Sequence, residues 1–147
     1  MTVLQNNHFK IIKLVPNMMR NRQVNMIYYN VLFTESEIIF DTLHQTFRPW
    51  LIHVKPFKNY VYENKNRNEI LMRNQENFSV LYSQIKSMKI KDGNFIYNSS
   101  IKILCKDIIP QLGTNKIYLF NKQKLKISKM LSEIKEYLEN NGISFIE

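Results

Sequence analysis

The fold is decided by residues 80–121, which read VLYSQIKSMKIKDGNFIYNSSIKILCKDIIPQLGTNKIYLFN. In this stretch, apolar, β-branched and aromatic runs alternate with turn residues, a pattern typical of β-strands. It predicts three strands, over 87–91, 101–105 and 116–120. Asp92-Gly93 is suited to a turn between the first two of them. We therefore expect antiparallel β structure here.

The residues that follow predict one closing helix. Asn121 is a suitable N-cap, and Asn141-Gly142 is a suitable C-terminal stop. Apolar residues recur between them at three- and four-residue spacing: Ile127, Met130, Leu131, Ile134 and Leu138. A stripe of this width needs a sheet to pack on. Strands followed by a lone helix predict an α+β, mainly β fold.

The first half of the chain predicts further strands. Residues 9–15 form a candidate strand that Pro16-Asn17 is expected to end, because proline cannot donate to a central ladder. A basic loop is expected over 18–25. Residues 24–34 and 37–41 predict a hairpin around a tight turn at Glu35-Ser36.

The middle of the chain is harder to assign from its pattern. Residues 43–62 mix aromatic and basic side chains around two prolines, which indicates an extended segment broken by proline. Residues 63–68 are polar and predict a surface loop, and 69–73 predict another strand.

Length and composition predict a soluble, cytoplasmic single domain. The chain has 147 residues, of which 44% are hydrophobic and 12% aromatic, as in a packed globular protein. No apolar run approaches the roughly 20 residues of a membrane span, and residues 1–7 are too polar for a signal peptide. Cys105, the single cysteine, lies in a predicted strand and is expected to be a buried hydrophobe rather than a nucleophile.

The net charge of +9 has two readings. A basic protein suits a polyanionic partner such as nucleic acid or an anionic membrane. The abundant Lys, Asn, Ile, Tyr and Phe also have A/T-rich codons, so a low-GC genome would produce the same composition. The lysines are scattered along the chain without a block of roughly five or six like charges. Both readings stay open at this point.

Three segments resemble a known family: 10–16 as a first strand, 30–40 as a hairpin, and 80–90 as a later strand. Together with the closing helix they resemble a bacterial pleckstrin-homology-like domain of the PH and GRAM-related kind. The resemblance treats 1–147 as a single domain with an aromatic and basic insertion at about 43–77. It implies a PH-like open barrel of two antiparallel sheets capped by the C-terminal helix. It also implies a module that binds phospholipid head groups, peptides or proteins and does not catalyse.

The same resemblance suggests an anion site. In lipid-binding members of the family, the loop between the first two strands supplies cations, and Lys13, Arg20 and Arg22 match that pattern. Guanidinium groups suit phosphate oxygens because their forked donors match the oxygens in pairs. The alternative is an ordinary solvated basic loop.

Aromatic and basic residues interleave between 47 and 62. They are Phe47, Arg48, Trp50, His53, Lys55, Phe57, Lys58, Tyr60 and Tyr62. This mixture is typical of a protein-interface hot spot and also of a platform that stacks single-stranded nucleic acid. Alternate aromatics facing the core would give the same pattern. We predict a protein-binding surface formed by Phe47, Arg48, Trp50, Lys55, Phe57, Lys58 and Tyr60.

No residue pattern predicts catalysis, a cofactor or a metal site. His8, His44 and His53 lack Cys or carboxylate neighbours at metal-ligand spacing. There is no glycine-rich phosphate loop and no nucleophile elbow. The sequence therefore predicts a non-catalytic module that recognises another protein. The alternative is a peripheral binder of anionic lipid or nucleic acid that uses Lys13, Arg20, Arg22, Lys55 and Lys58.

Overall fold

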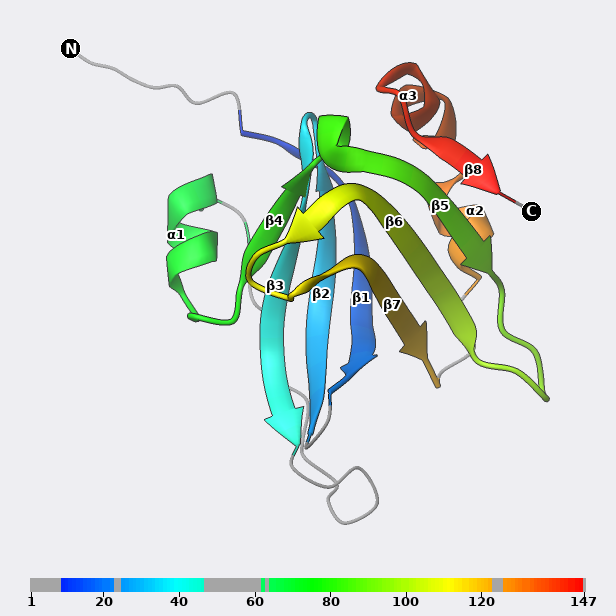
Figure 1. The fold of residues 1–147 in the computed structure, drawn as a ribbon, viewed down its shortest axis with the longest axis horizontal. Coiled ribbons are helices and arrows are strands. Elements are labelled where there is room, and N and C mark those ends of the chain that lie inside the picture. The colour runs from blue at the N-terminus through cyan, green and yellow to red at the C-terminus, as the bar shows by residue number, and fades with distance from the viewer. Residues whose placement is uncertain (1–8, 23–24, 47–61, 63, 123–125, 147) are drawn as a thin grey trace.

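The computed structural model describes residues 9–22, 25–46, 62, 64–122 and 126–146, and within them the chain is mostly β (Figure 1). One sheet contains all eight strands: β1 (Ile11–Asn21), β2 (Met26–Thr34), β3 (Glu37–Thr46), β4 (Phe78–Leu81), β5 (Ile85–Lys91), β6 (Ser99–Ile109), β7 (Thr114–Asn121) and β8 (Ser144–Ile146). Their order is β4-β3-β2-β1-β7-β6-β5-β8. The neighbouring strands are antiparallel except β5 and β8, which are parallel, so the sheet is mixed.

The helices are short. They are α1 (Arg67–Met72), α2 (Ile127–Leu131), α3 (Lys135–Asn140) and a 3-10 turn, η1 (Tyr82–Gln84). α2 packs against β1 and β5, while α1 lies over β3 on the other side of the molecule (Figure 1). None of these helices combines the length and the apolar character that crossing a membrane requires.

The expected barrel of two antiparallel sheets with one capping helix is wrong. β1 and β7 pair through Met19 and Phe120, which joins the two halves into a single sheet. The predicted closing helix is two short helices, and Asn121 does not cap the first of them. Asn121 ends β7 instead, and its side chain donates to the Asn17 carbonyl at 2.8 Å. After α3, a short strand, β8, pairs with β5 in parallel.

The core lies between the two halves of the bent sheet and the C-terminal helices. At its centre Phe40 and Phe78 stack with their ring centroids 4.4 Å apart, and Tyr29 meets both rings edge-on. The apolar stripe predicted after β7 does face this core: Ile127, Leu131, Ile134 and Leu138 are all buried. Burial of this stripe stabilises α2 and α3, whose own N-cap residues make no side-chain cap hydrogen bond.

The hairpin of β2 and β3 is confirmed. Its two-residue turn is Glu35-Ser36, and Thr34 Oγ1 accepts from the Glu37 amide at 3.0 Å while donating to the Glu37 carbonyl at 2.8 Å. Thr34 thus fixes the register, and with it the side chains that face the core.

The first strand is longer than predicted. Pro16 does not end it, because the register shifts between Val15 and Met18 and lets β1 continue to Asn21. Asn17 takes a positive φ of 55° at this bulge, and its amide donates to Asn30 Oδ1 at 3.3 Å. Bulges tolerate proline because the ladder is already interrupted there. Residues 18–21 of the expected basic loop are therefore strand.

The strand predicted over 69–73 is also wrong, because residues 69–72 belong to α1 and Arg73 is its C-cap. Asn66 caps the helix: its Oδ1 accepts from the Glu69 amide at 2.9 Å, and its own amide donates to Glu69 Oε1 at 3.3 Å. This reciprocal pair is a capping box. It begins a helix whose apolar side chain, Ile70, is buried against Leu32 and Ile39.

Candidate functional site

The charges of the sheet are unevenly distributed. β5, β6 and β7 contain six lysines and one acid: Lys86, Lys89, Lys91, Lys102, Lys106, Lys116 and Asp107. β2 and β3 contain two acids, Glu37 and Asp41, and neither lysine nor arginine. The positive charge that is scattered along the sequence therefore concentrates on one half of the sheet.

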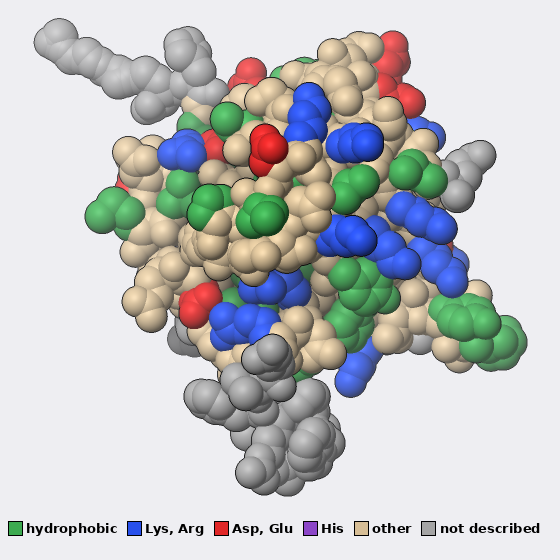
Figure 2. Space-filling model, in the orientation of Figure 1, with side chains coloured by type: hydrophobic (Ala, Val, Ile, Leu, Met, Phe, Trp, Pro, Cys, Tyr) green, Lys and Arg blue, Asp and Glu red, His purple; other side chains and the backbone are tan. Residues whose placement is uncertain are grey.

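Strand register places several of these lysines side by side. Met88, Ile101, Ile103, Ile117 and Leu119 are buried in the core. Because side chains alternate along a strand, their neighbours point outward. Lys89 lies opposite Lys102, and Lys102 lies opposite Tyr118. We call this outer surface the lysine face and define it by its exposed members: Lys89, Lys91, Lys102, Lys116 and Tyr118. Figure 2 shows Lys and Arg side chains gathered around hydrophobic ones on this half of the molecule.

Aromatic rings lie among the cations. Lys102 Nζ is 5.4 Å from the centroid of the Tyr118 ring, which is 46% exposed. At the end of β5, Lys91 Nζ is 4.3 Å from the ring of Tyr97, which follows the strand and is 54% exposed. Tyr118 also stacks on Phe120 with centroids 5.9 Å apart. The lysine face thus combines positive charge with accessible π-surface.

A shallow depression of about 310 Å³ lies in the lysine face. Its lining combines three lysines with mainly apolar side chains: Lys89, Lys102, Lys116, Ser87, Ile103, Leu104, Ile117, Tyr118 and Ile146. An apolar floor with ammonium groups around it suits a ligand that carries both a flat or apolar group and negative charge.

The lysine face is electrostatically unfavourable in the protein alone. Lys89 and Lys102 are directly opposed, and like charges at such positions destabilise a sheet. Five ion pairs occur among the described residues, and none of them includes a lysine of this face. A bound anion would relieve this repulsion.

This repulsion predicts that Lys89→Glu stabilises the protein. The introduced carboxylate would lie opposite Lys102, turning a repulsive pair into an attractive one. We expect the free energy of unfolding to rise by about 0.2–1 kcal/mol. Urea denaturation at neutral pH measures it. Lys86→Glu is the matched control, because Lys86 lies at the register shift of β5 and has no directly opposed lysine. An equal gain in both variants would contradict the explanation.

The predicted anion site is only partly assembled. Arg20 and Arg22 line one depression of about 550 Å³, which also contains Glu76, whereas Lys13 lies elsewhere on β1 and pairs with Glu133 at 3.5 Å. Arg22 is engaged within the protein, because its Nη1 lies 3.0 Å from Glu76 Oε2 and its Nη2 donates to Gln45 Oε1 at 2.7 Å. These contacts favour a structural role for Arg22.

Arg20 contacts the core. Its Nε donates to the Tyr29 hydroxyl at 3.2 Å. Burial raises the pKa of Tyr29 and outweighs the nearby Arg20 charge, which lowers it. An anion site built on Arg20 stays a prediction.

The predicted protein-binding surface lies outside the described residues, since Phe47 to Tyr60 all fall within 47–61. It stays a prediction. Tyr62, the next aromatic, belongs to a polar network: its hydroxyl donates to Asp41 Oδ2 at 2.6 Å and accepts from Asn30 Nδ2 at 2.9 Å. Burial, followed by the bond to Asp41, raises the pKa of Tyr62.

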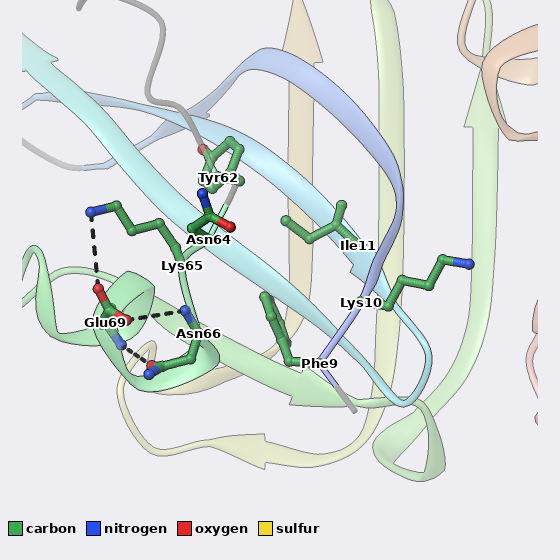
Figure 3. A pocket seen from close by; sticks show the side chains of 8 residues that line it. All are labelled: Phe9, Lys10, Ile11, Tyr62, Asn64, Lys65, Asn66 and Glu69. Atoms are coloured by element: carbon green, nitrogen blue, oxygen red, sulfur yellow. Dashed lines mark hydrogen bonds and ion pairs between the residues drawn. The ribbon is translucent and has the colours of Figure 1, made fainter. Parts of the chain in front are cut away.

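A larger depression, of about 600 Å³, lies beside the start of α1 (Figure 3). Two of its three charged side chains, Lys65 and Glu69, already serve local structure. Lys65 pairs with Glu69 at 3.9 Å, and Glu69 also completes the cap at Asn66. Figure 3 shows Lys10 extending away from this group. The lysine face is therefore the better candidate for ligand binding.

In the part of the chain that the structure describes, the other reactive groups do not form a cluster. Among the described residues, no three His, Cys, Asp or Glu side chains lie together in a way that could hold a metal ion. Cys105 is buried as expected, and burial raises the pKa of its thiol. His44 stacks on Tyr28 with ring centroids 4.1 Å apart, and burial lowers its pKa.

Comparison with known proteins gives little further information. No family model and no curated protein matches the chain. Among solved structures, the C-terminal domain of an unknown protein from Leishmania infantum is similar, with 14% sequence identity and a TM-score of 0.46. The likeness covers 88% of this chain and 85% of that one. It does not indicate a PH-like domain and carries no argument about function.

Proposed function

We propose that this protein is a non-catalytic binding module that holds a polyanionic partner on the lysine face. The observation that supports this proposal is the pairing of Lys89 with Lys102 beside Lys116, around an apolar depression. Such a grouping costs stability unless something negative covers it. This proposal agrees with the second function that the sequence suggested, a binder of anionic lipid or nucleic acid. It assigns the binding to the lysine face and not to the residues that the sequence analysis named.

The physics of polyanion binding suits this surface. Lysines that neutralise backbone charges release condensed counterions, so binding weakens linearly on a logarithmic salt scale. Exposed lysines on three adjacent strands can contact several charges of one flexible chain at the same time. The acids Glu37 and Asp41 lie on β3, in the other half of the sheet, and are buried, so they do not oppose this approach.

Retention on a heparin column tests the proposal, because heparin is a polyanion without bases. We expect the wild-type protein to be retained, and Lys102→Gln combined with Lys116→Gln to elute at clearly lower salt. Lys10→Gln combined with Lys65→Gln is the control, since it removes the same charge from exposed positions beside the other depression. Equal shifts in both double variants would mean that net charge, not the lysine face, governs retention. Failure of the wild type to bind would refute the proposal.

A further inference from the structure

We propose that the polyanion on the lysine face is a single-stranded nucleic acid whose bases stack on the aromatic rings of β7. This inference rests on the proposed function and names its partner. It is carried by the juxtaposition of Tyr118 and Phe120 with the lysines of β5 and β6.

The rings are positioned for stacking. Tyr118 and Phe120 are two residues apart on β7 and therefore point to the same face, where their rings lie 5.9 Å apart at an interplanar angle of 25°. Single-stranded nucleic acids bind sheets by stacking successive bases on such aromatic side chains. Tyr97, beyond the end of β5, offers a further exposed ring.

The lysines lie where a nucleic acid whose bases stack on β7 would place its phosphates. Lys102 lies opposite Tyr118 on the adjacent strand, and Lys89 lies one strand further. Adjacent strands are about 4.8 Å apart, so these lysines are within about 10 Å of the ring. Lys116 precedes Tyr118 by two residues on the same face. A nucleotide whose base covers Tyr118 can thus reach ammonium groups on two sides.

The exposed rings favour a single-stranded nucleic acid over other polyanions as the partner. A duplex keeps its bases stacked inside, so its phosphates could contact the lysines but its bases could not reach Tyr118. An acidic protein segment would satisfy the charges without a need for accessible π-surface. The apolar lining of the depression between Lys89, Lys102 and Lys116 also suits a base better than a chain of carboxylates.

Fluorescence anisotropy with three labelled probes of equal length tests the inference: oligothymidine, an abasic deoxyribose-phosphate oligomer and a polyglutamate peptide. We expect the wild-type protein to bind oligothymidine about tenfold or more tightly than the abasic oligomer, because stacking adds to the charge term. Tyr118→Leu should lower the affinity for oligothymidine to that for the abasic oligomer, and an unchanged far-UV circular dichroism spectrum would show that the variant is folded. Tyr118→Phe should keep the preference.

The outcomes distinguish the inference from the proposed function. Equal affinity for oligothymidine and the abasic oligomer, unaffected by Tyr118→Leu, would overturn base stacking and leave a general polyanion binder. Tighter binding of polyglutamate than of oligothymidine would overturn the inference in favour of an acidic protein partner. Absence of binding to all three probes would remove the proposed function as well.

Discussion

Arg73→Met is expected to lower the free energy of unfolding by about 3–5 kcal/mol, the usual cost of leaving a buried charge without its partner. Asp41 is completely buried, and Arg73 Nη2 donates to its Oδ1 at 2.6 Å. Arg73 also donates to the Thr42 carbonyl at 2.5 Å. The variant would keep the apolar stem of the side chain but lose the charge. Urea denaturation monitored by circular dichroism measures the loss.

Lys65→Met is the control for this prediction. Lys65 and Glu69 form an ion pair at 3.9 Å, but their side chains are 41% and 49% exposed. Exposed pairs of this kind contribute about 0.5 kcal/mol or less. If Arg73→Met lowered the free energy of unfolding no more than Lys65→Met does, the pair between Arg73 and Asp41 would not be what holds α1 to the sheet.

The network around Asp41 explains why sequence patterns failed in this region. Asp41 also accepts from Asn77 Nδ2 at 2.7 Å, and the same nitrogen lies 2.7 Å from the Ile70 carbonyl. At the other end of α1, Arg67 pairs with the buried Glu37. The partners of Asp41 and Glu37 in this network, Arg73, Asn77 and Arg67, are 30 or more residues away from them, so local propensity could not indicate these pairs.

A local signal for α1 was nevertheless present. Asn66 and Glu69 have the spacing of a capping box, in which residues three apart satisfy each other's amides. The apolar run at 70–72 favoured a strand instead, because short apolar runs fit strand and helix equally well. The hairpin of β2 and β3 could be predicted because its turn and its alternation are both local.

Predicting the lysine face would have required the pairing register of β5, β6 and β7, which one sequence does not determine. Alternation within β5 and β7 could be predicted and already placed Lys89 with Lys91, and Tyr118 with Phe120, on one face of each strand. The pairing of Lys89 with Lys102 could not be predicted from alternation alone, because it also depends on a register shift between Ile85 and Ser87. A slip of one residue would send these side chains to the opposite face. Lysines that looked scattered were therefore neighbours across strands.

Reversing two charges of the lysine face should change both the strength and the salt dependence of binding. If four lysines contact phosphates, the logarithm of the oligothymidine affinity should fall with log salt at a slope of about −2.8, since each contact on a single strand contributes about −0.7. Lys102→Glu combined with Lys116→Glu removes two contacts and should halve this slope. The same counterion release makes each lysine–phosphate contact raise the affinity about fivefold at 0.1 M salt. Loss of two contacts should therefore lower the affinity at least about 25-fold.

Anisotropy titrations of oligothymidine from about 0.05 to 0.2 M salt measure both quantities, a range in which such slopes are well resolved. Lys10→Glu combined with Lys65→Glu makes the same change in net charge and should leave the slope near the wild-type value. A slope that fell equally in both variants would show that the strand is not held at defined lysines. A halved slope in the first variant alone would place two of the phosphates beside Tyr118, which is the geometry that base stacking on β7 requires.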